Sequence, residues 1–468
     1  MPASAKHSPV EFNRELIVRY DTTGPRYTSY PTAAEFRPDF SGRNLRRHID
    51  LSNERSPQRP LSLYCHIPFC DTICFYCACN KVVTRNRGHS LGYLDRLHAE
   101  IDRMADLFRG RRRVTQLHWG GGTPTFLSHE QLRGLMERIR ERFPLAGDAE
   151  GEYGIEIDPR RLPPGTVALL REIGFNRLSM GIQDLDPDVQ QAVNRIQPAE
   201  LTFGVLDEAR AAGFRSVSVD LMYGLPRQTP EHFARTLRAV IAAGPDRLSV
   251  FNYAHLPHRF KTQRQIDEAE LPSAGDKLTM LARTIELLQS AGYVYIGMDH
   301  FAREDDELAR ALRDGTLQRN FQGYSTHAEC ELVAMGNSAI SQIGDCYAQN
   351  AHTLDDYYAR IDAGELATVR GVELNADDHL RRGVISDLMC RFGVRFTEVE
   401  ARFGIDFKNY FRDELRDLEG FSADGLVDMD DDGVCVTASG RLLIRNIAMV
   451  FDAYRRRGGQ QQAFSKVI

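Results

Sequence analysis

The sequence is organised around one cysteine-rich stretch, Tyr64-Cys65-His66-Ile67-Pro68-Phe69-Cys70-Asp71-Thr72-Ile73-Cys74-Phe75-Tyr76-Cys77-Ala78-Cys79-Asn80-Lys81. It holds five of the nine cysteines, and Cys70, Cys74 and Cys77 follow a C-x3-C-x2-C spacing. The stretch begins inside the apolar run 61–67, which predicts a strand. Three thiolates on one tight loop can ligate three corners of a cubane iron–sulfur cluster and leave the fourth iron without a protein ligand.

An open iron of this kind can bind a second group. The amino and carboxylate groups of S-adenosylmethionine can chelate it, and an electron from the cluster can then break the sulfonium C–S bond to give a 5′-deoxyadenosyl radical. Two other uses of the cysteines were weighed. A disulfide framework is disfavoured, because the chain is long and shows no secretory signal. Structural zinc remains the rival, but it usually takes two separated ligand pairs, and here all candidates lie on one loop.

Composition bounds the class of protein. The chain has 468 residues, of which 42% are hydrophobic, and a net charge of −6. This length suits a large catalytic domain and a second, smaller domain, and this charge gives no indication of nucleic acid as a binding partner. The first fifteen residues lack the apolar core of a signal peptide, and no run of eighteen apolar residues predicts a membrane span. We therefore expect a cytoplasmic protein without membrane contact, for which a monomer suffices.

Strands and helices alternate from residue 61 onward. The expected strands are 61–67, 114–119, 152–158, 176–182, 215–222 and 247–253. The expected helices are 90–107, 128–142, 164–173, 186–212 (broken near Pro198) and 230–243. Such alternation implies parallel strands joined by crossover helices, and six units give an α/β fold, a partial (β/α)6 barrel with its functional residues at the carboxyl ends of the strands.

The strand ends carry small and polar residues. The second strand ends in Trp119-Gly120-Gly121-Gly122-Thr123-Pro124-Thr125, where glycines can expose backbone groups to a ligand. Side chains alternate between the two faces along a strand, and in each of the next three strands one face is small or polar. The residues of these faces are Gly154, Glu156 and Asp158 in the third strand, Ser179, Gly181 and Gln183 in the fourth, and Ser216, Ser218 and Asp220 in the fifth. Parallel strands are normally apolar on both faces, so this pattern predicts a ligand-filled interior; the alternative is a solvated face at an open edge.

The chain divides into three predicted parts. Residues 1–55 form a polar arm without long periodicity, 56–371 the catalytic domain, and 372–468 a small, mostly helical domain. In the arm, Gly24-Pro25-Arg26-Tyr27-Thr28-Ser29-Tyr30-Pro31-Thr32 suits an extended segment that contacts a ligand, or else a linker. Arg26 is a candidate for binding carboxylates.

The last part of the catalytic domain and the final domain give weaker signals. A helix over 274–291 and a strand over 293–298 are expected, followed by a loop-rich section that suits either a pocket wall or core. In the last domain, a hairpin over 425–437 and a final helix from Gly440 to Tyr454 suggest a winged-helix-like shape. Its hairpin carries four aspartates, which phosphate would repel, so we interpret it as a lid or packing domain.

Several motifs together resemble the oxygen-independent coproporphyrinogen III oxidase family of radical S-adenosylmethionine enzymes. Besides 64–81 they are Leu117 to Thr125, Gly174-Phe175-Asn176-Arg177-Leu178-Ser179-Met180-Gly181, Tyr223-Gly224-Leu225-Pro226 and Gly297-Met298-Asp299-His300-Phe301-Ala302-Arg303. The resemblance runs from Gly24 to the terminal Phe464-Ser465-Lys466-Val467-Ile468. One departure is Cys65, where the family usually has a plain hydrophobic residue; we expect a buried small side chain there.

The resemblance implies a reaction and its cofactors. Two propionate side chains of coproporphyrinogen III would become vinyl groups, giving protoporphyrinogen IX and two CO2 in haem synthesis. The propionate β-carbon carries no acidic proton, so hydrogen abstraction by a deoxyadenosyl radical suits it better than a general base. The cofactors would be one [4Fe-4S] cluster with three cysteine ligands and S-adenosylmethionine, with two molecules of the latter expected. An electron donor and an electron acceptor would also be needed, and the sequence identifies neither.

The resemblance also assigns residues. Cys70, Cys74 and Cys77 would ligate the cluster, and Cys79 matches an extra cysteine that matters for catalysis. Positions matching contacts of the cluster-bound S-adenosylmethionine are Tyr64, Gly121, Glu156 and Ile340. Positions matching the surroundings of a second one are Tyr76, Cys77, Gly122, Thr123, Gln183, Arg195, Asp220 and Ala254. The strand-face pattern independently selects Gln183 and Asp220, whereas Arg195 follows from resemblance alone.

Two other functions stay open. Haem chaperones resemble the same barrel but are generally shorter, and they lack both the Gly-Pro-Arg-Tyr-Thr-Ser-Tyr arm and the Cys-x-Cys after the cluster loop. This chain has both features. A radical methyltransferase that uses two S-adenosylmethionines is the third possibility.

Overall fold

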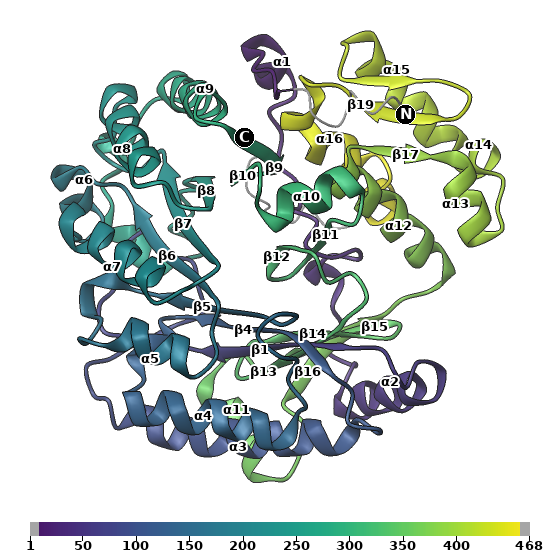
Figure 1. The fold of residues 1–468 in the computed structure, drawn as a ribbon. Helices are drawn as coiled ribbons and strands as arrows, with labels where there is room; N and C mark the ends of the chain where they lie inside the picture. Colours follow the sequence, from purple (N-terminus) through teal and green to yellow (C-terminus); the bar gives the residue numbers. More distant parts are fainter. Residues whose placement is uncertain (1–8, 459–468) are drawn as a thin grey trace.

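One twelve-stranded sheet forms the centre of the computed structural model, which describes residues 9–458 (Figure 1). Six neighbouring strands are parallel: β1 (Leu61–Ile67), β4 (Val114–Gly121), β5 (Glu152–Ile157), β6 (Arg177–Gln183), β7 (Ser216–Tyr223) and β8 (Arg247–Asn252). They match the six predicted strands, and their order confirms the open (β/α)6 barrel. The terminal residues 464–468, part of the resemblance, lie outside the described residues.

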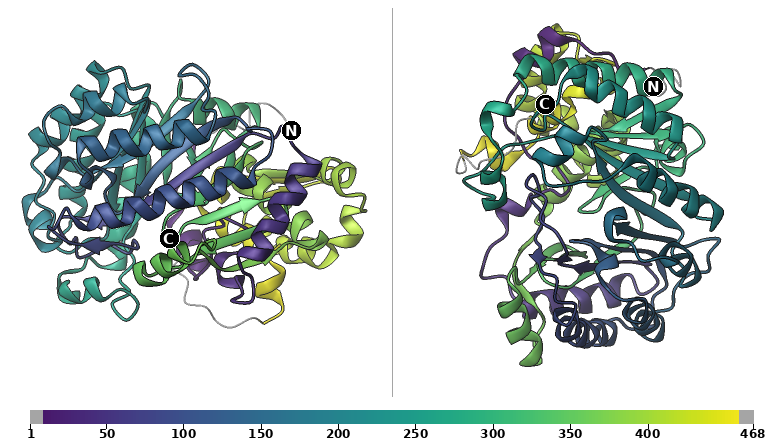
Figure 2. Two further views of the ribbon diagram at one scale, coloured as in Figure 1. Left: turned by 90° about the horizontal axis from the view of Figure 1, so that it is seen from below. Right: turned by 90° about the vertical axis from the view of Figure 1, so that its left-hand side faces the viewer.

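Helices cover the outer face of these strands, as predicted (Figure 2). They are α3 (His89–Leu107), α4 (His129–Arg142), α5 (Thr166–Glu172), α6 (Pro187–Ala192), α7 (Ala199–Ala211) and α8 (Pro230–Ala243). The predicted helix over 186–212 is indeed broken, since Pro198 stands at the N-cap of α7. Local signals set the ends: Ser128 and Gln131 form a capping box on α4, and Gly244 ends α8 in the left-handed region (φ 66°).

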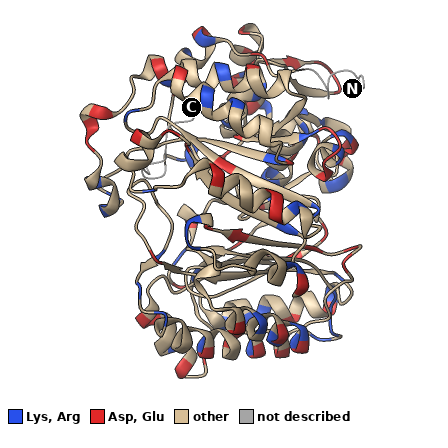
Figure 3. Ribbon diagram, turned by 60° about the vertical axis from the view of Figure 1, so that its left-hand side comes forward, with Lys and Arg blue, Asp and Glu red and all other residues tan. Residues whose placement is uncertain are grey.

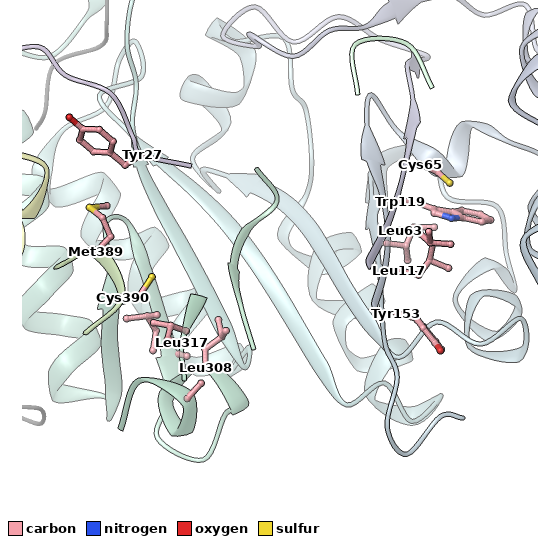
Figure 4. Packing of buried hydrophobic residues seen from close by; sticks show 14 of the residues in the cluster. Tyr27, Leu63, Cys65, Leu117, Trp119, Tyr153, Leu308, Leu317, Met389 and Cys390 are labelled. Atoms are coloured by element: carbon pink, nitrogen blue, oxygen red, sulfur yellow. The ribbon is translucent and has the colours of Figure 1, made fainter. Parts of the chain in front are cut away.

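The two faces of the parallel strands differ as the sequence predicts. Along β6 the apolar residues Leu178, Met180 and Ile182 are buried, and the small or polar residues between them are only half-buried. Figure 4 shows the apolar side in β1, β4 and β5, where Leu63, Cys65, Leu117, Trp119 and Tyr153 lie together. Cys65 is fully buried there, which confirms it as a small core residue. Because β5, β6 and β7 each have a strand on both sides, their polar face lines the barrel interior rather than an open edge.

The sheet continues beyond the barrel on both sides. On one side β13 (Glu331–Met335) pairs in parallel with β1, and the antiparallel strands β14 (Ile340–Ile343), β15 (Cys346–Asn350) and β16 (Thr368–Glu373) follow. On the other side β10 (His300–Arg303) joins β8 to β9 (Tyr293–Gly297). The predicted strand at 293–298 and the helix α9 (Ala274–Ser290) are confirmed. The loop-rich section instead contains the hairpin β11 (Gln318–Asn320) and β12 (Gly323–Ser325), then β13 and β14.

The N-terminal segment contains more structure than predicted. Besides α1 (Arg14–Arg19), it holds the fourteen-residue helix α2 (Gly42–Arg55), which lies against β14, β15 and β16 (Figure 2). The buried residues Leu45, His48, Ile49, Ser52 and Asn53 follow helical spacing, but three of the five are polar, so the apolar periodicity is weak. Arg37 pairs with Gly371 of β16. This segment is therefore built into the sheet rather than loosely attached to it.

The last part of the described chain packs beside β9 and the β11–β12 hairpin. It contains α12 (Ala376–Arg391), β17 (Gly393–Arg395), α13 (Phe396–Phe403), α14 (Phe407–Tyr410), α15 (Arg412–Ala423), β18 (Val427–Met429) and β19 (Gly433–Val436). The predicted hairpin is confirmed as β18–β19, and β17 adds an unpredicted third strand. The prediction of one helix over 440–454 is wrong, because the segment divides into η7 (Gly440–Leu443), α16 (Ile444–Met449) and α17 (Ala453–Arg456).

Charged residues of both signs are mixed over the outer helices, while the strands are mostly uncharged (Figure 3). None of the helices in the described range is long and apolar enough to cross a membrane.

Candidate active site

The cysteine loop begins where β1 ends, at the carboxyl ends of the parallel strands. The short strands β2 (Phe69–Cys70) and β3 (Val82–Val83) pair in parallel and close it at its base. Neighbouring segments hold its middle: Asn194 donates to the carbonyl of Ile73 (2.7 Å), and Gln263 donates to the carbonyl of Tyr76 (3.0 Å). These bonds fix the backbone between the cysteines, so the thiols are presented from a constrained loop.

Two of the three predicted ligands, Cys74 and Cys70, have polar groups close to their sulfur atoms. Cys74 is buried, and its sulfur accepts hydrogen bonds from Arg160 (3.3 Å) and Arg195 (3.6 Å). The sulfur of Cys70 lies 3.6 Å from the Thr123 hydroxyl, and burial raises the pKa of this thiol to about 11 even though that contact opposes the shift. A buried thiolate needs a cation to stabilise it, and a coordinated metal ion removes the thiol proton outright. Cys79 is exposed, unlike Cys74.

Three consecutive glycines allow the end of β4 to pack closely against the loop. A Cβ on Gly120 would lie 2.8 Å from the Glu156 carboxylate, and one on Gly121 would lie 2.5 Å from the His66 ring. A Cβ on Gly122 would lie 2.6 Å from the carbonyl oxygen of Pro68. These contacts are too close for any side chain, so the run Gly120–Gly122 brings the end of β4 against the start of the cysteine loop.

A polar row crosses the interior face of β1, β4 and β5. The ring of Tyr64 stacks on His118 (centroids 6.0 Å apart), and His118 lies 3.2 Å from a carboxylate oxygen of Glu156. The other carboxylate oxygen accepts the backbone N–H of Gly121 (3.2 Å). Burial disfavours the charged form of Glu156, but His118 and this N–H together hold its pKa below the ordinary value. Glu156 is therefore an anion beside the glycine run.

Two histidines of this row were missed by the sequence analysis. His66 bridges Tyr64 (3.1 Å from hydroxyl to Nδ1) and the carbonyl of Asn80 (3.1 Å from Nε2), so it connects the strand to the far end of the cysteine loop. His118 connects Tyr64 to Glu156. The alternation of side chains could have revealed both, since His66 shares a face with Tyr64, and His118 stands opposite Tyr64 in register.

A second group of polar residues lies at the end of β6. The backbone of Gln183 is in the left-handed region (φ 67°), at a bulge in the pairing with β7. Arg195 donates to the carbonyl of Gly181 (2.6 Å) and faces Asp158 at 3.6 Å. In the described part of the chain, Oε1 of Gln183 and Nε of Arg195 are buried without a hydrogen-bond partner. Such groups are costly unless a ligand satisfies them.

Asp220 and Ala254 complete this side of the interior. Asp220 stands in register between Gly181 and Ser249. Burial raises the pKa of Asp220 to about 7, a bond from Ser249 opposes this, and the Glu156 charge adds to it. Ala254 lies just past β8, where its carbonyl accepts from Gln263 (3.3 Å), the residue that also holds the cysteine loop.

Ile340 stands apart from the other predicted residues. It begins β14, which pairs with β13, so it lies two strands away from β1. Its partly buried side chain packs with an aromatic cluster that includes Phe36, Phe321 and Tyr347.

A separate basic group lies beside the arm. Arg26 binds Asp299 through both terminal nitrogens (2.7 and 2.5 Å), and Arg319 stacks on the ring of Tyr324 (4.7 Å) while donating to the Arg26 carbonyl (3.4 Å). Burial and the Arg319 charge lower the pKa of His300 to about 3. Within residues 9–458, Nη1 of Arg319 and Nε2 of Gln322 are buried donors without an acceptor. The sequence analysis selected Arg26 but missed Arg319.

These residues fit an iron–sulfur cluster with a polar organic ligand. The loop offers three thiols beside two guanidiniums, which favour an anionic centre, and the glycine run brings the end of β4 and the Glu156 carboxylate close to it. The unpartnered atoms of Gln183 and Arg195 call for a ligand with hydrogen-bonding groups. S-adenosylmethionine has such groups, so both cofactors suit the donor set.

Comparisons with known proteins agree with this chemistry. The Radical SAM superfamily pattern matches residues 64–240, and the HemN C-terminal domain pattern matches residues 374–443. The chain is 55% identical to an oxygen-independent coproporphyrinogen III oxidase of Pseudomonas aeruginosa and 51% identical to that of Escherichia coli, covering 98% of this chain and 99% of each relative. The solved structure of coproporphyrinogen III oxidase (HemN) from Escherichia coli, described as a radical SAM enzyme, superposes with a TM-score of 0.91 at 50% identity, over 96% of this chain and 100% of that one. The chain therefore belongs to the oxygen-independent coproporphyrinogen III oxidase family of radical SAM enzymes.

Proposed function

We propose that this chain converts coproporphyrinogen III to protoporphyrinogen IX without oxygen, by oxidative decarboxylation of two propionate side chains. The observation that carries the proposal is the cysteine loop at the carboxyl end of β1, opening onto a half-buried polar row inside the barrel. The basic group of Arg26 and Arg319 lies beside the arm. Membership of the superfamily implies a [4Fe-4S] cluster and S-adenosylmethionine. Bound there, they would supply the radical chemistry needed to remove a hydrogen from the propionate β-carbon.

The residues of the chain have four roles in this proposal. Cys70, Cys74 and Cys77 hold the cluster, and Arg160 and Arg195 balance its negative charge through their bonds to Cys74. The wall next to the cluster, formed by Tyr64, Gly121 and the Glu156 anion, holds the S-adenosylmethionine amino group, for which a carboxylate is the natural partner. Cys79 lies exposed at the end of the loop, where it can contact substrate or cofactor. The apolar face of the parallel strands is buried against the outer helices and excludes water from that side of the sheet.

We assign a second S-adenosylmethionine to the neighbouring group of residues. Gln183 and Arg195 offer buried hydrogen-bonding atoms without partners, and Asp220 lies close by. Tyr76, Gly122, Thr123 and Ala254 border the same space in this proposal. Ile340 is retained as a contact of the first molecule on family resemblance alone.

The substrate carboxylates are assigned to the basic group beside the arm. The substrate carries four carboxylates, and a guanidinium pairs with a carboxylate through two parallel hydrogen bonds. Arg26 already pairs with Asp299, whereas Nη1 of Arg319 and Nε2 of Gln322 have no acceptor among the described residues. Arg319 is therefore the principal carboxylate-binding residue in this proposal, and Arg26 the secondary one. Arg26 lies over the ring of Phe251, and Arg319 lies over the ring of Tyr324. These aromatic rings can pack against pyrrole rings of the substrate.

The three predicted parts of the chain have separate roles in this proposal. Residues 1–55 contribute to substrate binding, 56–371 carry the chemistry, and 372–468 close the substrate side. Free cysteines and an oxygen-sensitive cluster suit a reducing cytoplasm, where the enzyme works as a monomer with a separate electron donor and acceptor.

One anaerobic assay tests the proposal. The protein is reconstituted with iron and sulfide, then given S-adenosylmethionine, a reductant and coproporphyrinogen III. We expect the vinyl product and 5′-deoxyadenosine to appear together, with two S-adenosylmethionines retained per chain in equilibrium dialysis. An intact cluster with tight haem binding and no product would instead identify a haem chaperone.

A further inference from the structure

A second group of metal-binding side chains lies at the opposite end of the barrel from the cysteine loop. His327, Glu329 and Cys330 belong to the turn between β12 and β13. This turn faces the amino ends of the parallel strands, because its partners are Thr115, the second residue of β4, and Glu152, the first residue of β5. The group has no part in the proposed reaction.

The turn brings three ligand atoms together. The backbone N–H of Cys330 donates to the carbonyl of His327 (3.4 Å), which curls the chain. Nδ1 of His327 lies 3.2 Å from a Glu329 oxygen, and the Cys330 sulfur lies 3.6 Å from the same oxygen. All three ligand atoms lie within 4.8 Å of one another. Tetrahedral zinc with its usual bond lengths separates its ligand atoms by about 3.4–3.8 Å, so small side-chain adjustments suffice.

Outer contacts orient two of these ligands. The second ring nitrogen of His327 lies 3.8 Å from the Glu152 carboxylate, and the His327 side chain is only 15% exposed. The Thr115 hydroxyl lies 3.1 Å from the Cys330 sulfur. In metal sites a carboxylate on the far side of a ligating histidine fixes the ring and its tautomer, and a hydroxyl next to a thiolate does the same for sulfur. The cluster therefore has both direct ligands and the residues that would support them.

We propose that His327, Glu329 and Cys330 bind one zinc ion, with Glu152 and Thr115 as supporting residues. One imidazole, one thiolate and one carboxylate form a mixed donor set that suits a borderline ion such as zinc and not calcium or magnesium. Water would take the fourth position, on the side where Glu329 is 52% exposed.

The ion would have a structural role at the junction of the two halves of the sheet. The turn leads directly into Glu331, the first residue of β13, which stands opposite Leu61 of β1. Glu331 is buried and binds Arg112 (2.7 Å) and the N–H of Gly344 (2.8 Å). Fixing the turn to β4 and β5 would thus secure the strand that connects the barrel to β14–β16.

The test uses the reconstituted holoenzyme under anaerobic conditions. The protein is dialysed against a micromolar free-zinc buffer, and iron and zinc are measured together by mass spectrometry. We expect one zinc ion per chain with no loss of iron, and zinc X-ray absorption with a single sulfur neighbour. His327→Gln and Cys330→Ser should weaken zinc binding at least tenfold, and Glu152→Gln about tenfold. Cys435→Ser, which removes another half-buried thiol, is the matched control and should keep full binding.

Three results would overturn the proposal. The first is no zinc uptake by the wild-type holoenzyme. The second is full uptake by both His327→Gln and Cys330→Ser. The third is zinc uptake matched by iron loss, which would place the ion on the cysteine loop. Iron content and circular dichroism show whether each variant is folded. Glu152→Gln keeps every direct zinc ligand, so it tests the site even if one of the ligand variants fails to fold.

Discussion

The two sides of the barrel interior are built in different ways. The proposed cofactor side comprises the cysteine loop, the polar row on β1, β4 and β5, and the polar group at the ends of β6 and β7. Most of its residues lie between 64 and 220, and Ala254 and Ile340 are the exceptions. The substrate side joins Arg26 of the arm, Asp299 and Arg319, and the backbone there also binds Arg445 through the Pro25 carbonyl (3.1 Å). The first side is encoded by local motifs, whereas the second exists only when distant parts of the chain pack together. Changes on the two sides should therefore have separable effects.

The largest effect is expected on the cofactor side. Cys74→Ser removes the buried sulfur that receives hydrogen bonds from Arg160 and Arg195, so the cluster loses one of three ligands. We expect complete loss of the visible cluster absorbance and of turnover. Cys435→Ser, measured in parallel, should change neither quantity. An intact spectrum and full activity in Cys74→Ser would remove this residue from the ligand set.

The next effect separates the two sides. Arg319→Ala should lower kcat/KM about 100-fold, as expected from the 2–5 kcal/mol that truncating one partner of a buried charged pair costs. Iron content and 5′-deoxyadenosine formation without substrate should stay normal, because the cluster side is unchanged. Arg319→Lys should recover part of the loss, and the exposed Arg310→Ala should have no effect. If Arg319→Ala lost its cluster, the two sides would not be independent.

A smaller effect is expected at Asp220, on the proposed cofactor side. Asp220→Asn should lower turnover by up to about tenfold, as expected from the loss of one hydrogen bond worth about 0.5–1.5 kcal/mol, while the cluster stays assembled. An unchanged rate would remove Asp220 from the site.

The raised pKa of Asp220 also predicts a pH dependence of stability. Burial is the main cause, and the folded-state pKa of about 7 lies above the unfolded value of about 3.9. The folded state then binds the proton more tightly, so this stabilisation is complete below pH 4 and is lost as the pH rises through 7. Urea midpoints of the cofactor-free protein at pH 5 and pH 8 should differ less in Asp220→Asn than in wild type. Asp207→Asn, whose side chain is 77% exposed, is the control.

The smallest effect tests how the arm is held. The Tyr27 hydroxyl donates to the buried Asp452 carboxylate (2.8 Å). Tyr27→Phe leaves that carboxylate short of one donor, which should lower the free energy of unfolding by about 1–3 kcal/mol without loss of iron. Tyr410→Phe removes a comparable bond to Asp377 at an exposed position and should cost less. Equal losses in the two variants would show that the arm is not specifically fixed at Tyr27.

This anchoring also changes what deletion of the arm would mean. Residues 1–32 include backbone groups that bind Arg445 and Tyr347, besides the Tyr27 hydroxyl. Removing them would expose the last domain and the substrate side together, so loss of activity would not by itself prove substrate contact. Point changes such as Arg319→Ala are the sharper test.

The sequence alone determined the parts governed by local rules. Strand alternation and the helical periods predicted the six strands of the barrel, their crossover helices and the polar interior face, because side-chain periodicity is set by the backbone of each element. The cysteine spacing predicted the cluster loop, since ligands on one short loop need no distant partner. The same alternation was sufficient to identify His66 and His118, although neither was selected.

Only the tertiary structure decided the rest. The helix α2 escaped prediction because three of its five buried positions are polar, namely His48, Ser52 and Asn53. They become buried through contact with segments far away in sequence. The pairing of β13 with β1 and the division of 440–454 into short helices likewise depend on neighbours that no local pattern specifies. Arg319 and the group of His327, Glu329 and Cys330 can be identified as candidate binding residues only from their three-dimensional neighbours. Hydrogen bonding and burial between distant segments, rather than propensity, decide which polar residues lack a partner and so call for a ligand.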